Sequence, residues 1–167
     1  MSNKKPPEEL FQKIKDNEGI IFKICNTYCQ NKTDREDLAQ EIVYHLLKSY
    51  HSFNDAYKFT TWMYRVALNV AISFYRKNKA DNVITLPEDE HDLADNHQTV
   101  ELEDNIIILQ QFISELKELD KALMILYLES KSYKEIADII GITETNVATK
   151  ISRIKDLLKQ KFSNLNH

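Results

Sequence analysis

The segment SYKEIADIIGITETNV, residues 132–147, decides the fold of the C-terminal part of the chain. Ser132 can cap a first short helix, and Glu135, three residues later, completes a capping box. Gly141 can adopt the left-handed backbone conformation that ends such a helix, and Thr143 can cap a second helix. This order of cap, helix, glycine turn and cap predicts a helix–turn–helix.

The second helix of this motif has one apolar side and one mostly polar side. Its apolar positions, which recur at helical spacing and are expected in the core, are Val147, Ile151, Ile154 and Leu158. The outward positions are Glu144, Asn146, Ala148, Thr149, Lys150, Ser152, Arg153 and Lys155. Such a helix can place its first residues against base edges in a major groove and its later basic residues against phosphates. The motif therefore predicts binding to duplex DNA, and the alternative is a helical hairpin with a solvated charged face.

Glycine and proline are rare in the rest of the chain. The 167 residues include two glycines and three prolines, of which Pro6 and Pro7 lie near the N-terminus and Pro87 is internal. With 43% hydrophobic and 29% charged residues, a mostly helical globular protein is expected. No apolar run approaches the roughly 20 residues that span a bilayer, and the segment MSNKKPPEEL lacks a signal-peptide pattern. We therefore expect a cytoplasmic protein without membrane insertion.

The net charge of −4 hides an uneven distribution of charge. Residues 32–80 hold eight Lys or Arg against five Asp or Glu, and residues 142–167 hold five against two. Between them, residues 81–104 hold nine acidic residues and no basic residue. Two mildly basic blocks that flank one acidic block are compatible with nucleic-acid binding at two places.

The N-terminal part predicts three helical segments. Residues 8–30 have apolar residues at helical spacing, and Thr33 with Glu36 forms a capping box that is expected to open a second helix. The buried stripe of this second helix is predicted to be Leu38, Ile42 and Leu46, with Val43 and Leu47 beside it. After a loop at residues 51–58, a third helix is expected from about residue 60 to 77, with the buried stripe Trp62, Val66, Val70 and Phe74.

The pattern along the whole chain predicts an all-α protein made of two small helical domains. Residues 8–78 form the first domain, and residues 79–104, which lack helical period, form a flexible acidic linker. Helical spacing resumes at about residue 105, continues in a helix from about residue 121 to 128, and leads into the helix–turn–helix. Residues 105–163 therefore form the second domain.

Two faces of the N-terminal domain are candidates for binding. The second helix exposes a polar side with Asp37, Gln40, Glu41, Tyr44 and His45, a pattern that is most often just a solvated face. The third helix carries Arg65, Asn69 and Arg76 on one face, bordered by Tyr64, Tyr75 and Lys77. Basic and aromatic residues together suit single-stranded or melted DNA, because exposed bases stack on aromatic rings. A stabilised surface helix is the alternative for this face.

Three blocks, taken together, resemble the extracytoplasmic-function (ECF) group of RNA polymerase sigma factors. DREDLAQEIV, residues 34–43, resembles the helix by which the family binds polymerase, and FTTWMYRVALNVAI, residues 59–72, resembles its promoter-melting and minus-ten-reading helix. The helix–turn–helix resembles its minus-thirty-five reader. The order and spacing of the three blocks match over about 130 residues. The resemblance implies an alternative sigma factor that directs promoter-specific transcription initiation, with a sigma region 2 helical bundle and a region 4 helix–turn–helix domain.

The resemblance also implies roles for individual residues. Core polymerase would be bound by Asp37, Gln40 and Glu41. Minus-ten DNA would be bound by the loop at residues 52–58 and the third helix, through Phe53, Asn54, Lys58, Trp62, Arg65, Asn69, Arg76 and Lys77. Minus-thirty-five DNA would be bound by Asn146, Thr149, Lys150, Arg153 and Lys155. The implied partners are core RNA polymerase, promoter DNA and an anti-sigma factor.

The chain departs from the family pattern at two positions of the recognition helix. Ala148 stands where the family often has a basic residue, and Lys150 stands where it often has arginine. Lysine cannot form the bidentate contact that arginine makes with guanine. The base contacts of this helix are therefore expected to differ from those of the family pattern.

Three other classes of protein compete with this interpretation. A conventional helix–turn–helix regulator fits the C-terminal motif equally well but leaves residues 34–43 and 59–72 unexplained. A protein-binding adaptor does not account for the basic recognition helix. The sequence has no glycine-rich phosphate loop, paired metal-ligand motif or nucleophile elbow, so we expect neither an enzyme nor a bound cofactor or metal.

The two cysteines, Cys25 and Cys29, are one helical turn apart. Half of a metal site, with His45 or His51 as partners, is conceivable. The simpler prediction is a pair of reduced thiols packed in or near the core.

Overall fold

The structure is a computed structural model that describes residues 7–81 and 101–165. Every regular element in these two ranges is a helix, which confirms the predicted all-α class. Most of the expected acidic linker, including Pro87, His91 and His97, lies outside the described residues. No helix in the described ranges is both long enough and apolar enough to span a membrane.

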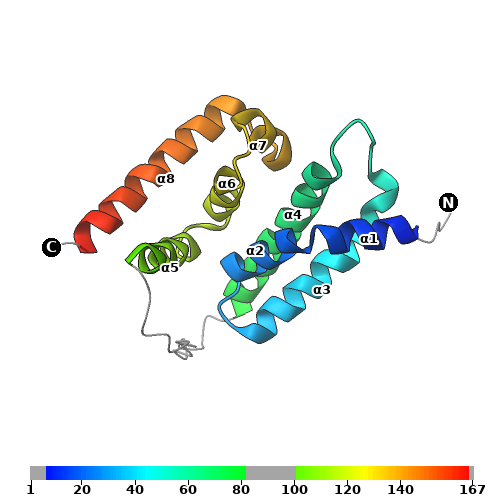
Figure 1. Cartoon of the computed structure of the whole chain (residues 1–167), viewed down its shortest axis with the longest axis horizontal. Helices are drawn as coiled ribbons and strands as arrows, with labels where there is room; N and C mark the ends of the chain where they lie inside the picture. Colours follow the sequence, from blue (N-terminus) through cyan, green and yellow to red (C-terminus); the bar gives the residue numbers. More distant parts are fainter. Residues whose placement is uncertain (1–6, 82–100, 166–167) are drawn as a thin grey trace.

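The N-terminal part is a bundle of four α-helices and one short 3₁₀ helix (Figure 1). Its elements are α1 (Glu8–Asp16), α2 (Glu18–Tyr28), α3 (Lys32–Ser49), η1 (Tyr50–Ser52) and α4 (Phe59–Asp81). Helices α2, α3 and α4 pack against one another. The predicted stripe of α3 is confirmed, because Leu38, Ile42 and Leu46 are fully buried.

Two details of the N-terminal prediction are wrong. Helix α3 is capped by Asn31, whose side chain accepts a hydrogen bond of 2.8 Å from the backbone N–H of Asp34, and not by Thr33 with Glu36. An asparagine at this position is as good a cap as threonine and starts the helix two residues earlier.

The buried stripe of α4 is the second error. Trp62 is buried as predicted, but Val66, Val70 and Phe74 are half-buried. The buried positions of this helix are Trp62, Met63, Tyr64, Ala67, Leu68 and Ala71. They cover a wider part of the helix than one stripe because α4 contacts α2, α3, α6 and α7.

The C-terminal part contains four helices, α5 (Glu101–Ser114), α6 (Glu118–Leu128), α7 (Tyr133–Ile140) and α8 (Glu144–Leu165). The predicted helix–turn–helix of α7 and α8 is confirmed. Oγ of Ser132 accepts a hydrogen bond of 3.1 Å from the backbone N–H of Glu135, and Oγ1 of Thr143 accepts one of 3.1 Å from that of Asn146. Gly141 has a φ of 84°, the left-handed conformation that was expected of it.

The buried positions of α8, the second helix of the helix–turn–helix, also match the prediction. The buried residues of α8 are Val147, Ile151, Ile154 and Leu158. They pack against α6 and α7, which fixes the direction in which the outer face of α8 points.

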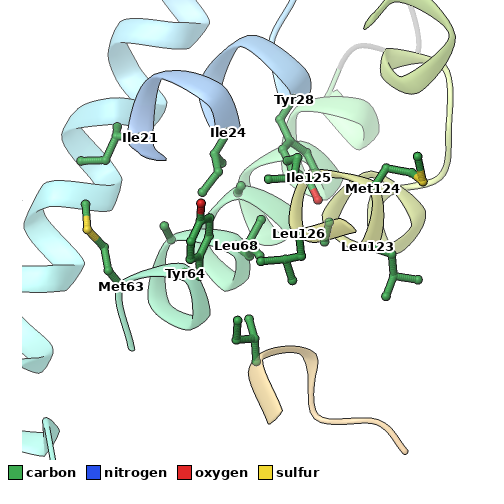
Figure 2. Packing of buried hydrophobic residues seen from close by; sticks show 14 of the residues in the cluster. Ile21, Ile24, Tyr28, Met63, Tyr64, Leu68, Leu123, Met124, Ile125 and Leu126 are labelled. Atoms are coloured by element: carbon green, nitrogen blue, oxygen red, sulfur yellow. The ribbon is translucent and has the colours of Figure 1, made fainter. Parts of the chain in front are cut away.

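The two helical groups pack directly against each other. Helix α2 contacts α5 and α6, and α4 contacts α6 and α7. Side chains of α2, α4 and α6 point toward one another where the groups meet, among them Ile24, Tyr64, Leu68 and Leu126 (Figure 2). The described residues therefore share one continuous hydrophobic core.

Candidate nucleic-acid interface

The first candidate surface lies on α3. Asp37, Gln40 and Glu41, the residues that the resemblance assigns to polymerase binding, are all exposed. Beside them lies a shallow, mostly apolar groove of about 450 Å³ that is lined by Ala39, Gln40, Val43, Tyr44 and Leu47. Carboxylates next to an apolar groove form a surface suited to a protein partner with basic and apolar side chains.

The apolar part of this surface was not identified from the sequence. The signal was present, because Ala39, Val43 and Leu47 are spaced four residues apart and form a second stripe next to the buried one. We expected Val43 and Leu47 only to flank the core. They pack against it while also lining the groove.

The second candidate surface surrounds the loop before α4. The rings of Tyr50, Phe53, Phe59 and Trp62 form one aromatic cluster, with 5.4 Å between the ring centroids of Phe53 and Trp62 and 5.6 Å between those of Phe59 and Trp62. Trp62 is only 8% exposed, so its main contribution is to support the loop.

Polar residues of this loop lie outside the aromatic cluster. Asn54 and Lys58, both assigned to minus-ten DNA, are exposed, and Phe53 is half-buried. Oδ1 of Asn54 accepts a hydrogen bond of 3.0 Å from the backbone N–H of Ala56, which shapes the turn. The loop therefore presents polar groups from a rigid aromatic base.

The third candidate surface is the basic face of α4. Asn69 and Lys77 are exposed. Arg65 and Arg76 have partners in the C-terminal group. Nη2 of Arg65 donates a hydrogen bond of 2.6 Å to the backbone carbonyl of Asp138, and Nε of Arg76 donates one of 2.8 Å to Oε1 of Glu118.

The aromatic border expected for this face is largely turned away from solvent. Tyr64 is 3% exposed, and Tyr75 packs partly buried against the core. Burial raises the pKa of Tyr64 to about 12, and the nearby carboxylate of Glu129 contributes to the same shift. The hydrogen bond from Arg76 holds the pKa of Glu118 below its usual value. The arginines and tyrosines of α4 thus face the C-terminal helices in this structure.

The fourth candidate surface is the outer face of α8. Asn146, Thr149 and Arg153 are exposed, as expected for residues that reach base edges or phosphates, and Lys150 is half-exposed. Nζ of Lys155 lies 4.4 Å from the ring centroid of Tyr127, so this lysine leans back onto α6. A hydrogen bond with Tyr127 raises the pKa of Lys155.

A pocket beside the recognition helix adds a residue that sequence reasoning missed. It has a volume of about 350 Å³ and lies between α8 and the start of α6, lined by Lys117, Glu118, Leu119, Asp120, Lys150, Arg153 and Ile154. Lys117 thereby joins Lys150 and Arg153 in the lining of one pocket, which also includes Glu118 and Asp120 at the N-terminal end of α6. No spacing could have indicated this, because Lys117 is far from the recognition helix in sequence.

The two cysteines are packed in the core of the N-terminal bundle, as the simpler prediction stated. Cys25 is 3% exposed and Cys29 is 5% exposed. Burial raises the pKa of the Cys25 thiol to about 11 and that of the Cys29 thiol to about 12. Both therefore remain protonated at neutral pH and are poor nucleophiles. Residues 7–81 and 101–165 contain no group of three His, Cys, Asp or Glu side chains placed to hold a metal ion.

Each of the two helical groups matches a known family. The family model of sigma-70 region 2 matches residues 14–80, and that of sigma-70 region 4 matches residues 106–158. The ECF RNA polymerase sigma factor SigW of Bacillus subtilis is 27% identical over 97% of this chain and 94% of its own length. The ECF RNA polymerase sigma-E factor of Haemophilus influenzae is 21% identical over 99% of this chain and 100% of its own length.

Solved structures share the fold. The sigma factor RpoE of Bartonella quintana, crystallised with the anti-sigma factor NepR, superposes with a TM-score of 0.72 at 18% identity and covers 94% of this chain and 98% of that one. CnrH, in complex with the cytosolic domain of CnrY, superposes with a TM-score of 0.66 at 14% identity, covering 93% and 88% of the two chains.

The fold and its surfaces define a two-domain, all-α protein with a helix–turn–helix in its second domain. The chain belongs to the sigma-70 family of RNA polymerase sigma factors, in its ECF group.

Proposed function

We propose that this protein is an alternative sigma factor that binds core RNA polymerase and directs promoter-specific transcription initiation. The observation that carries the proposal is the presence of both region 2 and region 4, in that order, in one chain. A conventional helix–turn–helix regulator has no need of a region 2 domain. The activity is one of binding and positioning, exercised with DNA and polymerase in the cytoplasm.

In this proposal each surface binds a different partner. The exposed side of α3, with Asp37, Gln40 and Glu41 beside the apolar groove, binds the polymerase core. The loop before α4 and the basic face of α4 read the minus-ten strand. The outer face of α8, with Asn146, Thr149, Lys150, Arg153 and Lys155, reads the minus-thirty-five element.

This assignment proposes residues 8–78 and 105–163 as the two functional domains, with residues 79–104 as the linker between them. Polymerase that holds both domains at once raises the effective concentration of each on DNA, so weak single contacts can add to specific promoter binding. A sigma factor of the same fold has been crystallised with an anti-sigma factor, and we propose a partner of this kind for the present chain.

The test is run-off transcription with purified bacterial core polymerase and a pool of genomic promoter fragments. We expect discrete new transcripts that depend on the protein and disappear with Asp37→Arg/Glu41→Arg. A matched control, Glu8→Arg/Glu9→Arg, makes the same change of charge on the exposed side of α1 and should keep full activity. Absence of transcripts together with tight, sequence-specific binding to duplex DNA by the protein alone would instead identify a conventional regulator.

A further inference from the structure

Helix α6 begins at a lysine whose side chain takes no part in capping the helix. Lys117 is the N-cap residue, a position that favours serine, threonine, aspartate or asparagine because their side chains accept a hydrogen bond from the first turn. A lysine side chain can only donate, so it cannot cap. The side chain of Lys117 makes no capping bond and is exposed. Its ammonium group is therefore left for another ligand.

Tertiary packing places Lys117 beside the recognition helix. Helix α6 packs against α8 (Figure 1), and the pocket of about 350 Å³ between them is lined by Lys117 as well as by Lys150 and Arg153 of α8. Asn146, Lys150 and Arg153 are separated by four and three residues, so they lie on the same side of α8. The pocket therefore borders the side of α8 that is assigned to DNA.

The width of the DNA groove determines what a lysine in this position can contact. An α-helix with its side chains is about 10–12 Å across, and the major groove of B-DNA is about 12 Å wide. A recognition helix thus fills the groove, and groups beside the helix meet the phosphates that border it. Lys117 lies beside α8 in this way. Its ammonium group is therefore placed for a phosphate and not for a base.

The charges around the pocket favour an anion. Its lining includes three basic residues, Lys117, Lys150 and Arg153, and two acidic residues, Glu118 and Asp120. Oε1 of Glu118 accepts a hydrogen bond of 2.8 Å from Nε of Arg76, which compensates one of the two negative charges. Even without Arg76, three cations exceed two carboxylates. The lining therefore carries a net positive charge.

We propose that Lys117 binds a phosphate of duplex DNA at the edge of the minus-thirty-five element, next to the groups that Lys150 and Arg153 contact. The inference rests on the proposed function, which assigns the outer face of α8 to this element. A lysine ammonium acts on phosphate as a point charge and reads no sequence. Lys117 thus adds affinity and helps to orient the C-terminal domain on DNA, whereas discrimination between sequences stays with α8.

The experiment measures promoter binding by holoenzyme assembled from core polymerase and the full chain. The DNA is a fragment that gives a transcript in the run-off test, together with copies whose minus-thirty-five element is altered. Lys117→Ala and Lys117→Arg are compared with Lys159→Ala, which removes an exposed lysine of α8 that does not line the pocket. Filter binding between about 50 and 200 mM salt, at a temperature that keeps the promoter closed, gives the affinity and its salt dependence.

We expect Lys117→Ala to weaken binding about two- to fivefold at about 0.1 M salt, as for loss of one exposed ion pair. The factor should be the same on every fragment, because a phosphate contact carries no sequence information. The slope of log affinity against log salt should fall in magnitude by about 0.9, the value for one phosphate. Lys117→Arg should restore both quantities, and Lys159→Ala should match the wild type. A purely structural role of Lys117 would lower the melting temperature without changing the slope.

A second measurement locates residue 117 on the DNA. Cys25 and Cys29 are buried, so an iron chelate that reacts with thiols labels the variant Lys117→Cys at the surface position. We expect the chelate to cleave the DNA backbone where it borders the minus-thirty-five element.

Two results would overturn the inference: a Lys117→Ala holoenzyme with the affinity and salt slope of the wild type, or cleavage confined to DNA away from the minus-thirty-five element. Either result with normal wild-type transcription refutes the inference and leaves the proposed function intact. Absence of both promoter binding and transcripts with the wild-type chain refutes the two together.

Discussion

Helices α4 and α8 have similar sequence patterns but different surroundings. Each carries a basic face opposite an apolar one, and the family resemblance assigns both faces to DNA. On α8 the exposed residues Asn146, Thr149 and Arg153 point to solvent. On α4, Arg65 and Arg76 contact the other domain. A basic helix face therefore shows that a helix can bind an anion, but only tertiary structure shows whether that face is free.

The largest effect on the contrast between α4 and α8 is expected from removing apolar contacts between α6 and the N-terminal domain, because these contacts hold the C-terminal helices against α4. Leu126→Ala should lower the free energy of unfolding by about 2–5 kcal/mol, because Leu126 is fully buried and its truncation leaves a cavity. Leu128→Ala on the same helix removes a side chain that is 52% exposed and should change it by less than about 0.5 kcal/mol. Urea denaturation followed by circular dichroism measures both. Equal stability of the two variants would contradict the buried position of α6.

A second change acts on the packing between the two domains through pH. Burial lowers the pKa of Lys121 from 10.5 to about 8 where α6 packs against the N-terminal domain. When the domains separate and Lys121 is solvated, its pKa returns toward the ordinary value, so the packed form binds fewer protons than the separated form. Packing should therefore strengthen as pH rises above 8, by up to about tenfold per pH unit.

The neighbours of Lys121 do not reverse this sign. The titratable or charged groups that face it are Tyr28, Cys29, Tyr75, Lys79 and Glu118. In the packed form the pKa of Cys29 is raised to about 12 by burial and that of Tyr28 is raised further, so both stay neutral. Ionisation of a solvated tyrosine near its ordinary pKa of about 10 would oppose packing, so the pH range is kept below that value. Small-angle X-ray scattering between pH 7 and 9 tests the effect. Lys121→Met should be compact with no pH dependence, whereas the same dependence in this variant would show that another group is responsible.

The third change removes Arg153, an exposed arginine on the outer face of α8. Arg153→Ala should weaken binding of the holoenzyme to the minus-thirty-five element by about 1–3 kcal/mol if this side chain reads a base. Lys159→Ala lies on an exposed part of the same helix further along and serves as the control for charge. Competition between the promoter and sequences with an altered minus-thirty-five element separates base reading from phosphate contact. An equal loss on all sequences would assign Arg153 to phosphates instead.

Much of the fold could be predicted because its signals are local. The caps at Ser132 and Thr143, the turn at Gly141 and the stripe of α3 each depend on residues within a few positions of one another. The error on α4 has a different origin. Tyr64 and Tyr75 were placed on an open face of α4 because nothing within that helix indicates that another domain covers it.

The candidate site, like the fold, could be predicted only where its signals are local in sequence. Lys117 reaches the pocket beside α8 through tertiary packing, which no spacing in the sequence indicates. One signal for the contact between the domains was present, since the run from Ala122 to Leu126 is apolar without interruption. Such a run has too many apolar residues for a helix with one covered side. The sequence thus indicates that α6 has a second neighbour, but not which one.

The smallest predicted effects compare the two glycines, which both have open space on the side where a Cβ would lie. A Cβ at Gly19 or at Gly141 would meet no atom within 4 Å, so neither substitution creates a clash. Gly19 lies within α2, where alanine restricts the unfolded chain and should stabilise the protein by about 0.5–1 kcal/mol. Gly141 has a φ of 84°, where alanine should cost about 1–2 kcal/mol. Thermal unfolding of Gly19→Ala and Gly141→Ala should therefore shift in opposite directions. If both melting temperatures shifted in the same direction, the turn between α7 and α8 could relax to a backbone conformation that L-residues accept. The fixed orientation of the recognition helix would then need another cause than the left-handed conformation of Gly141.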